Sequence, residues 1–154
     1  MKVEGEIRVE APRDMVFARL SDAPFFASCI DGVKDLTAID DTHFSALFET
    51  RVAYMRFTFK VTVEMTKTVA PETIEAKVEG TPMGVVGRLT ATASTQLRED
   101  GAQTAIRYSI DALLAGKLGS IGEPVLKAKA KEMEKQFAQR LQAAFANNGV
   151  EARA

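Results

Sequence analysis

Hydrophobic and polar residues follow two different periods along this chain, and the change between them divides it into two parts. Most of residues 2–114 fall into segments that alternate with a period of two, which is typical of strands with one buried face. From about residue 117 to residue 147, apolar side chains recur at helical spacing, which predicts one long amphipathic helix. Its apolar stripe consists of Leu118, Leu126, Ala130, Met133, Phe137, Leu141 and Ala144. Such a stripe has to be buried against another element of the fold.

The alternating part predicts about seven strands, joined mainly as a meander. The pattern is clearest at residues 55–68, where Phe57, Phe59 and Val61 alternate with polar residues. The other predicted strands span residues 2–10, 33–39, 43–50, 73–79, 89–97 and 106–114. Turn residues such as those at 99–101 separate neighbouring strands.

Two short helices are predicted between the first and second strands. Pro12 suits the first position of one helix, and Pro24 suits the first position of the other. The apolar residues of these helices are Val16, Phe17 and Leu20, followed by Phe25, Phe26, Cys29 and Ile30. Asp31 and Gly32 end the second helix. Because the two helices have to bridge a wide gap, we expect an α+β fold in which a curved antiparallel sheet grips the long helix, with a cavity between them.

Three parts of the chain resemble a known family. They are Met-Lys-Val-Glu-Gly-Glu at 1–6 with Ala-Pro-Arg at 11–13, Ser-Cys-Ile-Asp-Gly at 28–32, and Ala-Gly-Lys-Leu-Gly-Ser-Ile-Gly at 115–122. With this order of elements, the chain is similar to the family of the carbon monoxide dehydrogenase G subunit, within the START-like (SRPBCC) helix-grip superfamily. The resemblance implies a seven-stranded curved antiparallel sheet wrapped around the C-terminal helix. It also implies a single START-like ligand-binding domain at residues 1–147, followed by a tail at 148–154.

The resemblance further implies a non-catalytic accessory protein with an apolar cavity. Its partner would be a molybdenum-containing carbon monoxide dehydrogenase or a related hydroxylase. In that setting the protein would bring the enzyme to the membrane, or carry a hydrophobic molecule such as a lipid or a quinone. Some family members carry a C-terminal membrane-anchoring segment, which is not found before Ala154. We therefore expect peripheral rather than stable membrane contact.

Charge and composition narrow the function classes. The formal net charge is −1 and the sequence pI is about 5.9, so the charge gives no reason to expect nucleic acid as a partner. No apolar run approaches the roughly 20 residues that span a bilayer, and the N-terminus lacks the apolar block of a signal peptide. We expect a cytoplasmic protein, with peripheral contact on the inner face of the membrane as the further option.

Candidate catalytic chemistry is sparse. His43 is the single histidine and lies beside a turn, and Cys29 is the single cysteine and lies among apolar residues. Neither belongs to a metal-ligand set or to a nucleophile and base pair, so we expect no metal and no cofactor. Two alternatives to a carrier remain open. One is a polyketide-cyclase-type enzyme on the same fold, and the other is a protein adaptor without a ligand. The enzyme would need polar residues that converge inside the cavity, for which the candidates are Tyr54, Arg56, Tyr108 and Asp111.

The carrier hypothesis predicts a set of apolar residues around the ligand. These are Phe17, Phe26, Phe57, Phe59, Val61, Leu89, Ala91, Ile110, Leu118, Ile121 and Phe137, with Phe48 and Met65 as additional candidates. Alternation distinguishes the two faces of each strand, but it does not tell which face is concave.

Two segments are candidates for gating the cavity. Met83 and Val85 lie in a glycine-rich connection that is either a plain flexible turn or an apolar flap over the cavity mouth. Gly119, Gly122 and Pro124 weaken the start of the long helix and predict a kink or break near residues 123–124. That break is either a poor helix start held by packing or a hinge that opens the cavity.

A row of lysines follows this helix start. Lys127, Lys131 and Lys135 are spaced four residues apart, beside the apolar stripe. The row is either an ordinary solvated face or a docking surface for an acidic partner or an anionic lipid.

Overall fold

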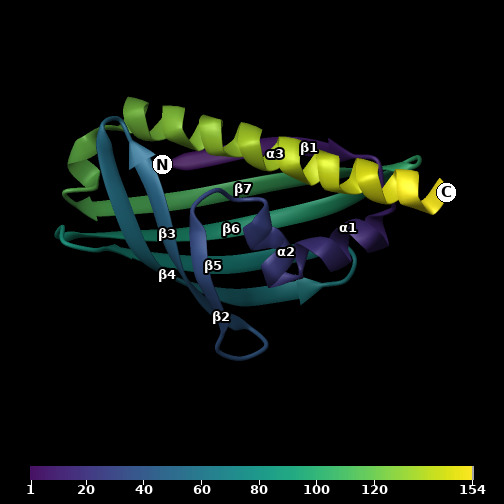
Figure 1. Ribbon diagram of the computed structural model, residues 1–154, viewed down its shortest axis with the longest axis horizontal. Helices are drawn as coiled ribbons and strands as arrows, with labels where there is room; N and C mark the ends of the chain where they lie inside the picture. The colour runs from purple at the N-terminus through teal and green to yellow at the C-terminus, as the bar shows by residue number, and fades with distance from the viewer. Residues whose placement is uncertain (154) are drawn as a thin grey trace.

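The strands form one antiparallel sheet in the order β1-β7-β6-β5-β4-β3-β2. The computed structural model describes residues 1–153. The strands are β1 (Lys2–Val9), β2 (Val33–Ala38), β3 (His43–Val52), β4 (Met55–Val69), β5 (Thr73–Pro82), β6 (Gly87–Asp100) and β7 (Gln103–Gly116). Figure 1 shows the sheet curving beneath the C-terminal helix. The predicted α+β fold, with a seven-stranded meander and the first strand returning to pair with the last, is confirmed.

Four helical segments complete the fold: α1 (Arg13–Leu20), α2 (Ala23–Ser28), the short 3₁₀ turn η1 (Gly119–Ile121) and α3 (Glu123–Arg153). As predicted, α1 and α2 lie between the first two strands, and they connect the opposite edges of the sheet. The Asp22 side chain caps α2 by accepting a hydrogen bond from the Phe25 N–H at 3.5 Å. No helix in residues 1–153 combines the length and the apolar character needed to cross a bilayer.

The long helix differs from its predicted bounds at both ends. It begins at Glu123 rather than near residue 117, because Gly122 has a φ of 102° that a continuous helix does not contain. The break expected near residues 123–124 is therefore present. At the other end, the helix continues past residue 147 to Arg153, so residues 148–153 of the expected tail are helical. Ala154 lies outside the described residues.

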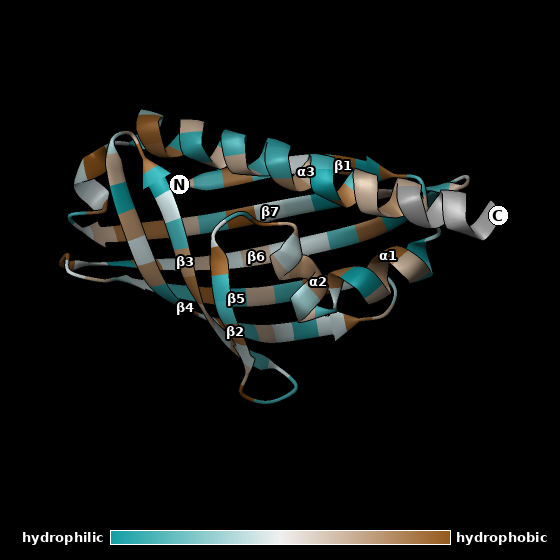
Figure 2. Cartoon of the chain, viewed as in Figure 1, coloured by the Kyte–Doolittle hydropathy of each residue, from teal (hydrophilic) through white to brown (hydrophobic). Residues whose placement is uncertain are grey.

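Alternation along the strands produces one buried and one exposed face, which Figure 2 shows as changes of hydropathy from residue to residue. On β4, Phe57 and Phe59 are buried, while Arg56 and Lys60 on the other face are exposed. On β1, Ile7 and Val9 are buried between charged neighbours. The faces predicted for these strands are thus confirmed.

The buried side chains form two separate clusters under the two ends of α3. The larger cluster contains Ile7, Val9, Ala11, Val16, Phe17, Leu20, Cys29, Ile74, Leu97, Ile106, Leu141 and Phe145. The smaller cluster contains Val52, Phe57, Phe59 and Leu118, with Ile121 and Leu126 packed against it. Side chains of or just before α3 therefore pack into the core near both ends of the helix. Its middle turns are left to cover the space between the clusters.

Candidate ligand-binding site

A cavity of ≈ 590 Å³ lies between the sheet and the middle of α3. Most of its wall is apolar, contributed by Met1, Val3, Ile7, Leu20, Phe26, Cys29, Ile30, Phe48, Ile74, Ala93, Ile106, Ile110, Ala112, Ala130, Met133 and Phe137. The polar residues of the wall are Asp31, Glu49, Thr50, Arg51, Thr95, Tyr108, Lys129, Glu132, Glu134 and Gln136. This volume falls in the range of about 300–1,000 Å³ that is usual for small-molecule sites.

Small side chains explain why the space between the two clusters stays open. Ala93 on β6 and Ala112 on β7 line the cavity from the sheet, and Ala130 lines it from α3. Larger residues occupy the facing positions near the helix ends, where Leu118 is 1 % exposed and Leu141 is fully buried. The sheet and the helix are therefore held apart by bulky residues at two places, and alanines between them do not fill the gap.

Tyr108 and Glu134 provide polar groups on opposite walls. Tyr108 pairs across the strands with Gly5, which leaves room for its ring because a Cβ at residue 5 would lie 2.3 Å from the Tyr108 hydroxyl oxygen. That oxygen is buried and has no hydrogen-bond partner among the described residues. Burial, together with the neighbouring Glu134 carboxylate, raises the pKa of Tyr108 well above its usual value.

The α2 side of the cavity is closed by contacts with α3. The rings of Phe26 and Phe137 lie 5.2 Å apart between centroids, and Arg140 Nη2 lies 2.5 Å from Asp31 Oδ1. Cys29 lines the same wall and is 3 % exposed, and burial raises the pKa of its thiol. Cys29 is thus a buried apolar residue, as expected, and its location is the cavity wall.

The cavity continues into an open groove on the side of β3. Arg51, Lys129 and Glu132 line both the cavity and the groove, and the Lys129 ammonium lies 3.6 Å from a Glu132 carboxylate oxygen. The rest of the groove consists of Ala53, Pro124, Val125 and Ala128. The mouth of the cavity therefore lies between the end of β3 and the first turns of α3, and its rim is charged.

The structure brings only part of the predicted ligand-binding set to the cavity. Phe26, Ile110 and Phe137 line it, as does the additional candidate Phe48. The other predicted residues do not line it: Phe57, Phe59, Val61, Leu89, Leu118 and Ile121 pack in the smaller cluster, Phe17 and Met65 pack in the larger one, and Ala91 is half-buried on β6. The expected faces are correct, but most of these residues fill the core beside the cavity. Contact of any of them with a ligand stays a prediction.

The candidate gating residues lie at the end of the molecule where α3 begins. Met83 and Val85 belong to the β5–β6 turn and line neither the cavity nor the groove. Gly119 and Gly122 lie in and after η1, and Pro124 lines the groove at the mouth. Their role in gating remains a prediction. The lysine row is exposed, and Lys127 lies 3.3 Å from Glu123.

The polar residues proposed for an enzyme do not gather in one place. Tyr108 lines the cavity, whereas Tyr54 is 95 % exposed and Arg56 and Asp111 are exposed as well. His43 lies at the start of β3, as expected, with its Nδ1 2.8 Å from Asp40. The Thr42 backbone N–H and His43 lower the pKa of Asp40 to about 2, which is a local property of this turn.

Sequence reasoning missed much of the cavity wall. Ala130 and Met133 belong to the predicted apolar stripe, and Ala93 and Thr95 belong to the inward row of β6, so their faces were recognisable. No local pattern distinguishes a cavity position from a core position on the same face. The polar residue Glu134 follows Met133 on α3 and carries no such signal at all.

Comparison with solved structures places the fold among known ones. The structure superposes on a conserved protein from Geobacillus kaustophilus with a TM-score of 0.87 and 23% identity, covering 96% of each chain. A START superfamily protein from Mycobacterium smegmatis gives a TM-score of 0.71 at 11% identity, covering 95% of this chain and 97% of that one. The Zhui aromatase/cyclase from Streptomyces gives a TM-score of 0.70 at 15% identity, covering 95% of this chain and 93% of that one. These likenesses establish a START-like helix-grip fold.

Comparison of the sequence identifies the family. Curated proteins give no match. The family of the carbon monoxide dehydrogenase G subunit (CoxG) matches residues 5–146, which is nearly the whole chain. The matched region contains both buried clusters and almost all of the cavity wall. The chain therefore belongs to the CoxG family of carbon monoxide dehydrogenase.

Proposed function

We propose that this protein binds a hydrophobic small molecule, lipid-like or quinone-like, in the cavity beneath α3. The main support for this proposal is a mostly apolar space of ≈ 590 Å³ at the centre of the fold. Because apolar space of this size loses packing and hydrophobic stabilisation while it is empty of an apolar partner, burial of an apolar ligand there is favourable. The few polar groups on the wall suit one polar feature of such a ligand.

The wider role follows from family membership. As a member of the CoxG family, the protein acts as a non-catalytic accessory. It serves a molybdenum-containing carbon monoxide dehydrogenase or a related hydroxylase and takes part in the recruitment of that enzyme to the cytoplasmic face of the membrane. The ligand is the cargo that the accessory protein holds for its partner.

Native mass spectrometry of protein purified from its source tests the proposal directly. A lipid or quinone that co-purifies at one molecule per chain supports the carrier. A stable complex with the dehydrogenase and an empty cavity supports a protein adaptor instead, and would contradict ligand carriage.

Filling the cavity tests which space the ligand uses. Ala130→Phe and, independently, Ala93→Phe place a ring into the cavity from α3 and from β6. Each should weaken binding of the neutral apolar fluorophore N-phenyl-naphthylamine by at least about tenfold, because the ring occupies the volume of the probe. The matched control is Ala143→Phe on the exposed face of α3, which should bind like the unmodified protein. Circular dichroism confirms that each variant is folded. Equal binding by folded cavity variants and control would contradict a site in this cavity.

A further inference from the structure

Exposed apolar side chains gather at one end of the molecule. Six large hydrophobic residues at that end are at least one-third exposed: Tyr54 at 95 %, Val86 at 82 %, Leu113 at 72 %, Met83 at 58 %, Met55 at 46 % and Val125 at 38 %. They come from the β3–β4 turn, the β5–β6 turn, the end of β7 and the start of α3. We call these six residues the apolar end.

Backbone contacts hold these segments together. The Met83 N–H donates to the Thr58 carbonyl at 2.8 Å, and the Lys117 N–H donates to the Val86 carbonyl at 2.9 Å. Figure 1 shows the two turns, the end of β7 and the start of α3 at the same end of the fold. Scattered exposed apolar residues are ordinary, but a concentration on neighbouring turns marks a contact surface.

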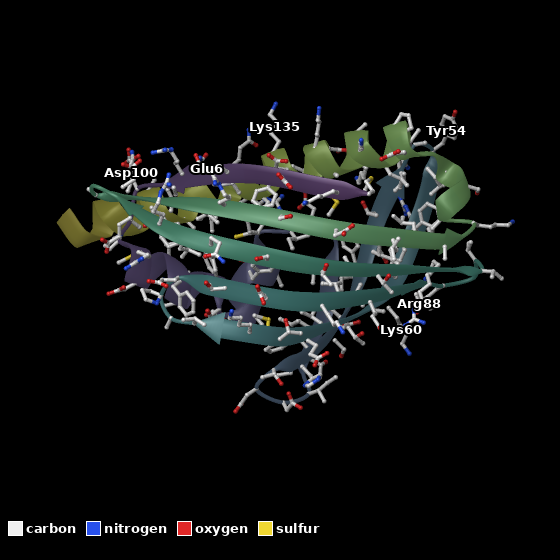
Figure 3. All side chains as sticks on the ribbon, turned by 180° about the vertical axis from the view of Figure 1, so that it is seen from behind. Glu6, Tyr54, Lys60, Arg88, Asp100 and Lys135 are labelled. Carbon is white, nitrogen blue, oxygen red and sulfur yellow. The ribbon has the colours of Figure 1, made fainter. Side chains whose placement is uncertain are left out.

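The same segments carry positive charge. Residues 51–60, 79–90 and 111–127 contain the bases Arg51, Arg56, Lys60, Arg88, Lys117 and Lys127 and the acids Glu79, Asp111 and Glu123. Six bases against three acids give a local charge of +3, whereas the whole chain has a net charge of −1. Figure 3 shows Lys60 and Arg88 at the end that carries Tyr54, with Glu6 and Asp100 at the opposite end. The charge of the chain is thus unevenly distributed along its length.

The mouth of the cavity opens beside the apolar end. The groove that continues the cavity is lined by Ala53, next to Tyr54 in the β3–β4 turn, and by Val125 of the apolar end itself. A molecule leaving the cavity through this groove would meet the apolar end before it reached bulk water.

We propose that the apolar end docks on an anionic lipid bilayer and that the cavity exchanges its ligand with the bilayer through this groove. Separate turn tips with apolar side chains and a surrounding positive charge match a surface that is apolar beneath and anionic at its face. Tyr54 suits the interfacial region because its ring is apolar and its hydroxyl is polar. The docking stands on the surface alone, whereas the exchange step rests on the proposed function.

Co-sedimentation with phosphatidylcholine vesicles, with and without phosphatidylglycerol, tests the docking. The unmodified protein should partition more strongly onto the anionic vesicles, and added salt should weaken this binding. Tyr54→Ser with Val86→Ser should lower partitioning by at least about tenfold, because both side chains leave the apolar layer. The matched control is Met15→Ser with Ile39→Ser, which removes two exposed apolar residues elsewhere and should bind like the unmodified protein.

Charge reversal tests the electrostatic part. Arg56→Glu with Lys60→Glu should reduce binding to anionic vesicles by roughly thirtyfold at low salt and should leave binding to neutral vesicles nearly unchanged. The control pair is Lys67→Glu with Arg98→Glu, two exposed bases outside this end, which should have a much smaller effect. Equal losses for both pairs would show general charge attraction and would overturn the assignment of the surface.

Binding of N-phenyl-naphthylamine without vesicles separates this inference from the proposed function. Both apolar-end variants should bind the probe like the unmodified protein, yet extract it more slowly from anionic vesicles. If the unmodified protein binds the probe but no vesicles, the docking proposal fails and the proposed function stands. If it binds vesicles but no probe, the proposed function fails. Sedimentation that shows a dimer abolished by Tyr54→Ser with Val86→Ser, without vesicle binding, would assign the surface to a second copy and overturn the proposal.

Discussion

Tyr108 owes its position to a residue that has no side chain. Gly5 lies directly opposite it across β1 and β7, and only the missing Cβ lets the ring lie against that strand. The resulting burial leaves the hydroxyl without a hydrogen-bond partner among the described residues, beside the Glu134 carboxylate. Both effects oppose ionisation of the tyrosine, because an anion would lose its hydration next to another negative charge.

This environment predicts alkaline sensitivity. The folded pKa of Tyr108 is raised above the unfolded value of about 10, so its contribution to stability is present below about pH 10 and is lost as the pH rises further. In the Tyr54→Phe variant Tyr108 is the single tyrosine, and its ultraviolet tyrosinate signal should appear only together with the loss of circular dichroism. Tyr108→Phe should flatten the fall of the unfolding free energy above about pH 10. Tyrosinate formation in a fully folded protein near pH 10 would contradict this.

Among the elements, the breaks between helices and strands position the cavity wall. Gly32 has a φ of 89°, and its carbonyl accepts a hydrogen bond from the Glu49 N–H at 2.9 Å. This turn directs the chain from α2 into β2 and places Asp31 beside Arg140 of α3. The sequence signal Asp31-Gly32 correctly predicted the end of the helix, but not the contact with β3.

Gly32→Ala should therefore be strongly destabilising. A Cβ at this position would lie 2.0 Å from the Glu49 carbonyl oxygen, in addition to the cost of a positive φ. We expect a loss of at least about 3 kcal/mol in the free energy of unfolding, measured by urea denaturation. The matched control is Gly101→Ala, where φ is also positive and nothing lies within 4 Å, so the expected loss is only about 1 kcal/mol. Similar losses at both positions would show that the contact with Glu49 relaxes.

The segment before α3 carries a second prediction about an element boundary. Leu118 is buried in the smaller cluster, whereas Gly119 and Ser120 are exposed and Gly122 interrupts the helix. If this segment is the hinge of the cavity, amide exchange over residues 116–124 should be faster than in the rest of α3 up to Phe145 and should slow when N-phenyl-naphthylamine binds. Uniformly slow exchange with and without the probe would support a helix start that is simply held by packing.

In the molecule as a whole, α3 spans a gap between two supports. The larger cluster lies under its C-terminal half and the smaller one under its start, while the alanines between them leave the cavity. The mouth, the apolar end and the positive charge all lie where α3 begins. This arrangement joins ligand binding and membrane contact in one part of the protein, as the two proposals require.

Local sequence patterns were sufficient to predict the elements and their faces. Periods of two and of about 3.6 residues are local properties, so the seven strands, the short helices, the break near Gly122 and the buried face of β4 could all be predicted. The family resemblance was equally available, because it rests on short local segments, and the family match confirms it.

Which buried residues line the cavity depended instead on the packing of α3 over the sheet. Phe59 and Ile110 both point inward, yet Phe59 packs in the smaller cluster and Ile110 faces open space. The difference depends on what the facing helix presents at that height, and this is set by the curvature of the sheet and the placement of α3. For the same reason the apolar end was hidden in the sequence, since its residues lie on four segments that are brought together only in the folded chain.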